Sequence, residues 1–188
     1  MLKPIYLIFN KPYGVLCQFS DEAGRKTLKD FIPIPGIYSV GRLDFDSEGL
    51  LLLTNDGVLK HRVSDPRYKQ PKIYWAQVER VPSQEELNKL RNGIMIEGKR
   101  TLPAEIKLMS DDPAVWERSK PIRFRKTVPT CWLEITINEG MNRQVRKMTA
   151  AIGHPCLRLI RVAIGPIRLN DLKPGEYNFI EKPVLRLL

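Results

Sequence analysis

Residues Gly41 to Gly57 read Gly-Arg-Leu-Asp-Phe-Asp-Ser-Glu-Gly-Leu-Leu-Leu-Leu-Thr-Asn-Asp-Gly. The stretch predicts a buried strand at Leu50 to Thr54, because a short apolar run closed by an Asn-Asp-Gly turn is typical of one. Just before this strand, three carboxylates stand at alternate positions, Asp44, Asp46 and Glu48. We therefore expect the chemistry of the protein at this edge of a strand.

Length and composition limit the classes of protein to consider. The chain has 188 residues, 43% of them hydrophobic. This is enough for a single domain over residues 1–188. Whether that domain is divided into two lobes around a cleft stays open. Runs of about 18 apolar residues, as in membrane helices, are absent, and the first residues do not resemble a secretion signal. Three cysteines without CxxC spacing favour a reducing compartment. We expect a cytoplasmic protein without a metal, and a monomer.

The positive charge is concentrated in one part of the chain. Residues 118–168 hold 11 Lys and Arg against Glu134 and Glu139, a net charge of +9 (11 minus 2) in a protein of net charge +10. A solvated charged face is the usual explanation of scattered basic residues. An excess on this scale favours nucleic acid or another acidic surface as the partner. Composition alone leaves RNA, DNA and anionic lipid open.

The remaining pattern predicts an α+β fold made mostly of strands. Short helices are expected near Thr27–Phe31, at Val58–Ser64 before Asp65-Pro66, and after a capping box of Ser83 and Glu86. Residues 110–129, with three prolines, are expected to form a long loop or lobe junction. The expected strands are Ile5–Phe9, Val15–Phe19, Ile37–Leu43, Leu50–Thr54, Ile73–Val78, Ala104–Met109, Trp132–Ile137 and Leu157–Ile164.

A basic amphipathic helix is expected between Asn142 as N-cap and Gly153 as the C′ residue. Its apolar side must pack against the core, so its basic side points away from the core. An ordinary surface helix would give the same pattern. The basic side carries Arg143, Arg146 and Lys147, and the apolar side Val145, Met148 and Ile152.

The carboxylate cluster is compatible with three kinds of role. An EF-hand calcium loop counted from Asp44 would need a glutamate where Asn55 stands, and its middle is apolar, so calcium is disfavoured. A magnesium nuclease would need a further acidic cluster. The remaining role is a single nucleophilic or basic carboxylate held by an arginine. Asp44 follows a predicted strand at a turn, where a side chain can face a cleft, whereas Asp46 and Glu48 are interpreted as turn residues.

Five motifs cover nearly the whole chain in order: Asn10-Lys11-Pro12-Tyr13-Gly14, Gly41 to Gly57, Lys72-Ile73-Tyr74, Glu139 to Met148 and Leu159 to Gly165. Together they resemble the RsuA-type family of ribosomal RNA pseudouridine synthases. Connecting segments at residues 21–28 and 121–126 resemble the RluE branch, which acts on large-subunit (23S) rRNA.

The resemblance implies a bisected, mostly antiparallel mixed sheet flanked by helices and loops, with a basic cleft. It also implies isomerisation of uridine to pseudouridine without metal or organic cofactor. Asp44 matches the catalytic aspartate, and its carboxylate either adds to C1′ or removes the C2′ proton. Arg146 is the expected ion-pair partner of Asp44, with Arg143 as the fallback.

The other implied roles concern substrate binding. Tyr74 is expected to stack on the uracil, and Leu159 to wall the pocket. Candidates for phosphate contacts are Arg42, Lys72, Arg143, Lys147, Arg158 and Arg161. The chain departs from the family at Phe45 and Met141, where polar or basic residues are common, and no S4 module is expected before Ile5. A non-catalytic RNA-binding or ribosome-assembly protein on the same scaffold is the alternative.

Overall fold

The computed structural model describes residues 3–64, 70–122 and 127–181 and has an α+β fold. The helices are the 3-10 helix η1 (Leu28–Asp30), α1 (Gly57–Ser64), α2 (Gln84–Arg91) and α3 (Gln144–Ala151). The strands are β1 (Tyr6–Lys11), β2 (Tyr38–Val40), β3 (Glu48–Thr54), β4 (Lys72–Glu79), β5 (Met95–Ile96), β6 (Lys99–Arg100), β7 (Glu105–Leu108), β8 (Thr130–Ile137), β9 (Cys156–Ile164), β10 (Ile167–Arg168) and β11 (Tyr177–Phe179).

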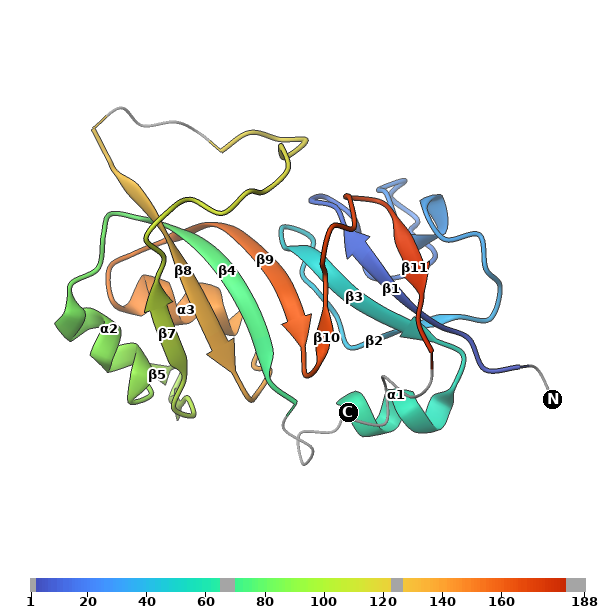
Figure 1. Ribbon diagram of the computed structural model, residues 1–188, viewed down its shortest axis with the longest axis horizontal. Coiled ribbons are helices and arrows are strands. Elements are labelled where there is room, and N and C mark those ends of the chain that lie inside the picture. The colour runs from blue at the N-terminus through green and yellow to red at the C-terminus, as the bar shows by residue number, and fades with distance from the viewer. Residues whose placement is uncertain (1–2, 65–69, 123–126, 182–188) are drawn as a thin grey trace.

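The main sheet has the order β11-β1-β3-β9-β4-β8-β7 and is divided at its centre (Figure 1). On one side, β11, β1, β3 and the added strand β2 form the first half. On the other, β9, β4, β8 and β7 form the second half. The halves meet where β3 and β9 pair in parallel over two residue pairs, Glu48 with Ile160 and Gly49 with Arg161, whereas the other pairings of the sheet are antiparallel. The predicted bisected, mostly antiparallel sheet is confirmed.

Gly49 permits this junction. Its φ of +100° suits glycine, and a Cβ atom there would collide with the backbone of Arg161. The aliphatic run that follows is completely buried, from Leu50 to Leu53, and supplies both faces of β3. Leu50 and Leu52 pack on one side, and Leu51 and Leu53 on the other. A strand buried on both faces has an apolar run rather than alternation, as the sequence predicted.

The helices follow local sequence signals with one exception. Ser83 and Glu86 form the predicted reciprocal capping box of α2. The predicted apolar side of α3 is buried at Val145, Met148 and Ile152. The N-cap of α3 is Arg143 rather than the predicted Asn142, and Arg143 has a left-handed φ of +51°. Contacts of its side chain, described below, account for this departure.

Other departures concern short elements. The predicted strand at Val15–Phe19 was wrong, because that segment is irregular and makes an isolated bridge between Leu16 and Thr27. The strand expected at Ile37–Leu43 is limited to β2. The β5–β6 hairpin, β10 and β11 were not predicted. Asp65-Pro66 and residues 123–126 lie outside the described residues.

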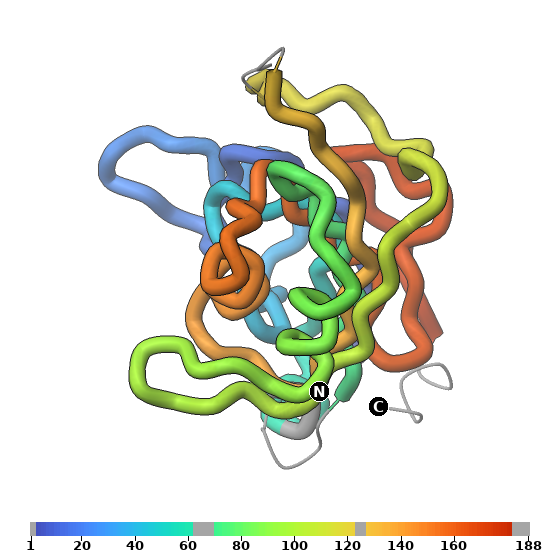
Figure 2. The backbone as a smooth tube through the Cα atoms, turned by 90° about the vertical axis from the view of Figure 1, so that its left-hand side faces the viewer, coloured from blue at the N-terminus to red at the C-terminus, as the bar shows by residue number. Residues whose placement is uncertain are grey.

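The segment between β7 and β8 joins two strands of the second half and also contacts the first half, where the Trp116 indole donates to Glu48 of β3. Its described part, residues 109–122, is irregular and crosses toward the first half above the junction (Figure 1). In Figure 2 the β5–β6 hairpin, α3 and the blue loop after β1 project to the side of the sheet opposite this segment. Among the helices of the described residues, none combines the length and apolar character required to span a membrane.

Candidate active site

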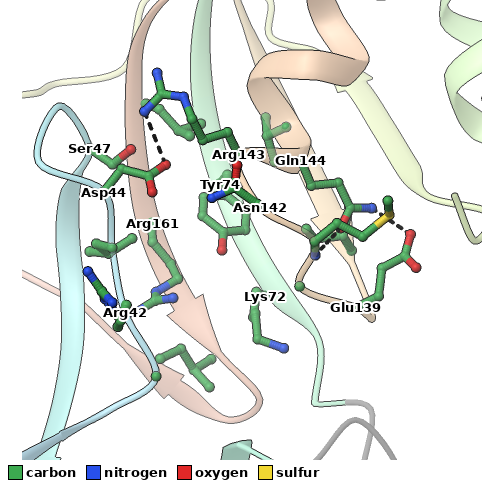
Figure 3. A pocket seen from close by; sticks show the side chains of 18 of the residues that line it. Arg42, Asp44, Ser47, Lys72, Tyr74, Glu139, Asn142, Arg143, Gln144 and Arg161 are labelled. Carbon is green, nitrogen blue, oxygen red and sulfur yellow. Dashed lines mark hydrogen bonds and ion pairs between the residues drawn. The ribbon is translucent and has the colours of Figure 1, made fainter. Parts of the chain in front are cut away.

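A cleft of about 790 Å³ lies where the halves of the sheet diverge. Its walls come from the β2–β3 connection, β4, β9 and the segment leading into α3 (Figure 3). Seven of the ten residues expected at the site line it: Arg42, Asp44, Lys72, Tyr74, Arg143, Leu159 and Arg161. The lining formed by the described residues leaves out Arg146, Lys147 and Arg158.

Asp44 stands at a turn that its own backbone closes. The Ser47 amide donates to the Asp44 carbonyl at 3.1 Å, and the Leu43 amide donates to Sγ of Cys17 at 3.3 Å. Leu43 is buried beside the turn, so its side chain anchors the turn to the core. The Asp44 side chain keeps about a third of its surface exposed (35%) and faces the cleft. This carboxylate is accessible to a bound substrate.

Arg143 is the arginine that pairs with Asp44. Its Nη1 lies 3.5 Å from Oδ2 of Asp44, and its guanidinium also makes a two-pronged contact with Asp46 at 2.8 and 2.7 Å. Asp44 thus pairs with Arg143, the fallback, whereas Arg146, the expected partner, pairs with Asp46 instead. Arg143 has a left-handed backbone, and its side chain points toward Asp44 (Figure 3). Bidentate geometry of this kind is specific to the planar guanidinium.

Arg146 ties the same turn to the second half of the sheet. Its Nη2 donates to the Asp46 carbonyl at 2.7 Å, its Nη1 donates to the Cys156 carbonyl at 3.1 Å, and its Nε lies 3.5 Å from the Asp46 carboxylate. The Arg146 side chain is 12% exposed. Arg146 therefore positions the turn that carries Asp44, and it does so from outside the cleft lining of the described residues.

Asp46 is a structural anion at the centre of these contacts. Hydrogen bonds from Arg143 hold the pKa of its carboxyl below the usual value, against partial burial, and the charge of Arg146 adds to the effect. The same pairing raises the pKa of Arg143. Its interpretation as a simple turn residue missed this role, because the two arginines lie about 100 positions further along the chain.

Glu48 and Arg158 form a second pair that is buried. Arg158 donates to both carboxylate oxygens of Glu48 at 2.8 Å, and the Trp116 indole donates to the same carboxylate at 2.8 Å. The side chains of Arg158 and Glu48 are 8% and 1% exposed. The guanidinium of Arg158 is enclosed and engaged, so the expected phosphate contact would require the pair with Glu48 to open.

Lys147 also differs from its expected role. Its ammonium group lies 2.7 Å from the Glu97 carboxylate on the β5–β6 hairpin and 3.3 Å from Asn142. It lies on the basic side of α3 as predicted but beyond the cleft lining of the described residues. A phosphate contact by Lys147 would require the Glu97 pair to open.

Tyr74 and Leu159 form an apolar wall opposite the acidic turn. Tyr74 lies on β4 beside Arg161 of β9, and Leu159 is paired with Ala76 of β4. Both side chains are buried to more than nine-tenths, yet both line the cleft. A flat aromatic ring in this position can stack on a base.

Lys72, Arg161 and Arg42 surround the other end of the cleft (Figure 3). Arg161 uses Nε to bind the Leu50 carbonyl at 2.8 Å, while its buried Nη2 has no hydrogen-bond partner among the described residues. Burial lowers the pKa of Lys72, and the charge of Arg161 lowers it further. Neighbouring cations with an unused donor form a site suited to an anion such as a phosphate.

The three carboxylates of the acidic motif do not converge on one point. Asp44 faces the cleft, Asp46 binds two arginines, and Glu48 is enclosed with Arg158. Within the part of the chain that is described, no group of three or more His, Cys, Asp or Glu side chains is arranged to hold a metal ion. The single-carboxylate role is the one that this arrangement favours.

Comparison with known families gives a match over most of the chain. The family model described as RNA pseudouridylate synthase matches residues 5–151. The chain is 54% identical over 177 residues to the ribosomal large subunit pseudouridine synthase E of Vibrio vulnificus (strain CMCP6), covering 94% of this chain and 75% of that protein. It is 50% identical over 182 residues to the enzyme of the same name from Xanthomonas campestris pv. campestris, covering 96% and 97%.

The fold has a match among solved structures as well. A crystal structure of a pseudouridylate synthase superimposes with a TM-score of 0.83 at 28% identity, covering all of this chain and 74% of the other. The match supports the fold class predicted from the motifs. Family, fold and cleft therefore point to the same class of protein.

Proposed function

The chain belongs to the RNA pseudouridylate synthase family, and on that premise we propose that it isomerises uridine to pseudouridine at a chosen site in large-subunit ribosomal RNA, with Asp44 as the catalytic carboxylate. In this reaction the N1–C1′ glycosidic bond breaks, the uracil turns, and a C5–C1′ bond forms. A proton leaves C5 and one is gained at N1, so substrate and product are isomers. No metal or organic cofactor is proposed.

One observation carries the proposal: the Asp44 carboxylate faces a cleft of nucleotide-accommodating size and is paired with Arg143 at 3.5 Å. Addition to C1′ and removal of the C2′ proton both require an ionised carboxylate. A guanidinium at this distance stabilises the negative charge by Coulomb attraction and fixes the direction of the carboxylate. Either route is compatible with this arrangement.

The walls of the cleft provide roles for the other residues. A target uridine must leave its stack, which costs a few kcal/mol and is offset by contacts in the pocket. Tyr74 supplies a ring on which the uracil stacks, and Leu159 closes the apolar side. Arg42, Lys72 and Arg161 bind the phosphates that flank the uridine. Arg146 acts as a positioning residue through Asp46 rather than as a catalytic one.

The substrate class follows from the relatives, which are named for the large ribosomal subunit. The excess of basic residues suits a polyanionic RNA. We place the reaction in the cytoplasm, where ribosomal RNA is processed in bacteria such as those of the relatives, and propose that the protein acts as a monomer.

The test is conversion of ribosomal RNA that lacks pseudouridine. Wild-type protein and Asp44→Asn are incubated with this RNA, and pseudouridine is mapped by chemical modification and primer extension. We expect wild type to convert one site, and Asp44→Asn to bind the RNA with unchanged affinity and yield no product. If RNA binds to wild type and no uridine converts, the proposal fails, and the non-catalytic RNA-binding alternative replaces it.

A further inference from the structure

Beside Asp44, but outside the cleft lining of the described residues, two tilted aromatic rings and a guanidinium lie in contact. We call Tyr13, Phe45 and Arg118 the aromatic cluster. The rings of Tyr13 and Phe45 have centroids 6.4 Å apart at 49°, and the Arg118 guanidinium carbon lies 4.4 Å from the centroid of Tyr13. These three residues come from the loop after β1, the β2–β3 turn and the β7–β8 segment.

The aromatic cluster is held by hydrogen bonds to backbone carbonyls, and these leave the Phe45 ring partly exposed. The Gly14 amide donates to the Phe45 carbonyl at 2.9 Å, which joins the loop after β1 to the Asp44 turn. Arg118 donates to the carbonyls of Lys120 and Leu157, so its position over Tyr13 is fixed from the second half of the sheet. Burial lowers the pKa of Arg118, which indicates that its charge is partly removed from solvent. Phe45, by contrast, keeps 42% of its surface exposed.

Phe45 leaves a large apolar ring partly in contact with solvent, so much of the gain from burying such a ring is not realised there. Its neighbours on both sides are placed for specific contacts, Asp44 toward the cleft and Asp46 toward Arg143. Because Phe45 directly follows Asp44 in the chain, a nucleotide next to a uridine bound at Asp44 can reach the exposed ring.

We propose that Phe45, backed by Tyr13 and Arg118, is a stacking site for the base of an unpaired nucleotide adjacent to the target uridine. The inference rests on the proposed function and adds a second point of contact to it. Aromatic side chains hold single-stranded bases by stacking without regard to sequence. The cation–π contact of Arg118 is with Tyr13, so Arg118 supports Phe45 through Tyr13. The site would keep the RNA beside the cleft extended while the uridine is turned out.

The test uses the rRNA fragment that wild-type protein converts, with 2-aminopurine placed one, two or three nucleotides to either side of the reactive uridine. Stacking quenches 2-aminopurine fluorescence. We expect quenching at one flanking position with wild type and with Phe45→Trp, and loss of that quenching with Phe45→Ala. Phe179→Ala is the matched control, because Phe179 is also an exposed aromatic residue (64%) but lies on β11 at the outer edge of the sheet.

The kinetic readout is KM for the same fragment. Phe45→Ala should raise KM by roughly five- to 150-fold, the range for loss of one base–aromatic stack, and Phe45→Trp should restore it. If Phe45→Ala matches Phe179→Ala in both KM and fluorescence while wild type converts its uridine, the stacking site is refuted and the proposed function stands. If wild type converts no RNA, the proposed function fails and the stacking site falls with it.

Discussion

Arg143 holds two carboxylates at once: its Nη1 lies 2.8 Å from Oδ1 of Asp46 and 3.5 Å from Oδ2 of Asp44. The shorter contact, with Asp46, fixes the Arg143 side chain. The longer contact directs that side chain toward the Asp44 carboxylate in the cleft. Since Arg143 lies between β8 and α3 and both aspartates lie between β2 and β3, this contact also fixes the two sides of the cleft relative to each other. Asp46 therefore sets the position from which Arg143 acts on Asp44.

Replacing Arg143 by methionine should slow turnover more than it weakens RNA binding. The substitution removes the charge that pairs with Asp44, and a small misplacement of a catalytic group can cost about 100-fold in rate. Single-turnover kinetics at saturating RNA measure the effect. Arg100→Met, which removes an equal charge from the exposed β5–β6 hairpin, is the control. Equal rates for the two variants would show that Arg143 does not act on Asp44.

The buried pair of Glu48 and Arg158 should contribute to stability in a non-additive way. Arg158→Met leaves the Glu48 carboxylate enclosed without its guanidinium, which should lower the free energy of unfolding by about 3–5 kcal/mol. Glu48→Leu combined with Arg158→Met should recover much of that loss, because no unpaired charge remains. Urea unfolding of the two single variants and the double variant gives the coupling energy. If the losses in the free energy of unfolding of the two single variants add up in the double variant, Glu48 and Arg158 are not energetically coupled.

Gly49→Ala should destabilise the junction between the halves. The new Cβ atom would meet the Arg161 backbone, and the φ of +100° is strained for alanine. Backbone strain and overpacking together predict a loss of roughly 3 kcal/mol or more in the free energy of unfolding. Gly57→Ala is the control, because Gly57 begins α1 and has open space where a Cβ would lie. A Gly49→Ala variant as stable as Gly57→Ala would contradict the tight junction.

The salt dependence of RNA affinity should separate Lys72 from Lys147. Lys72 lines the cleft beside Arg161, so Lys72→Ala should reduce the slope of log K against log salt by roughly 0.7, the value for one phosphate on a single strand. Lys147 is engaged with Glu97, and Lys147→Ala should change the slope less. Fluorescence anisotropy between low and moderate salt concentrations measures both slopes. A larger change for Lys147 would place the RNA along α3 rather than in the cleft.

Lys11 should make stability depend on pH in the alkaline range. Burial lowers its pKa from 10.5 to about 8, against the opposing charges of Cys17 and the acidic motif, and its Nζ donates to the carbonyls of Pro12 and Val15. Between these two pH values the unfolded chain binds more protons than the folded one, so the contribution of Lys11 to the free energy of unfolding rises with pH. The rise is limited to about 3 kcal/mol, from 1.36 kcal/mol per pKa unit.

The variant Lys11→Met isolates this effect. Cys156, whose pKa burial raises to about 11, contributes in the opposite direction over a similar range, so total stability is not a clean readout. The quantity to measure is the difference in free energy of unfolding between wild type and Lys11→Met at several pH values from 8 to 10.5. A difference that stays constant with pH would mean that the folded-state pKa of Lys11 is not lowered.

The sequence predicted helices and strands well where interactions between residues close together in the chain determine them. The Ser83–Glu86 capping box and the aliphatic run of β3 have the structure that their side chains favour within a few residues. The N-cap of α3 is different. Asn142 is the better cap by local preference, yet Arg143 takes the position because contacts with Asp44 and Asp46 hold it in a left-handed conformation.

At the site, motif positions identified most of the cleft lining but not the pairing of charges. The partners of Arg143 and Arg158 lie about 100 positions earlier in the chain, so no local pattern shows which carboxylate each will meet. Burial of Arg158 also depends on Trp116, from a segment with no regular structure in its described part. Which basic residue lines the cleft and which is buried in an ion pair is therefore determined by the tertiary structure.

The seam between β3 and β9 is two residue pairs long, and the cleft opens directly beside it. Asp44 arrives with one half of the sheet, and Tyr74 and Arg143 with the other, so neither half alone contains an assembled site. During refolding, enzymatic activity should return only after the two halves have docked. This should be later than the recovery of the circular dichroism signal from the strands and helices of each half. The return of turnover would then report the last assembly step of the chain.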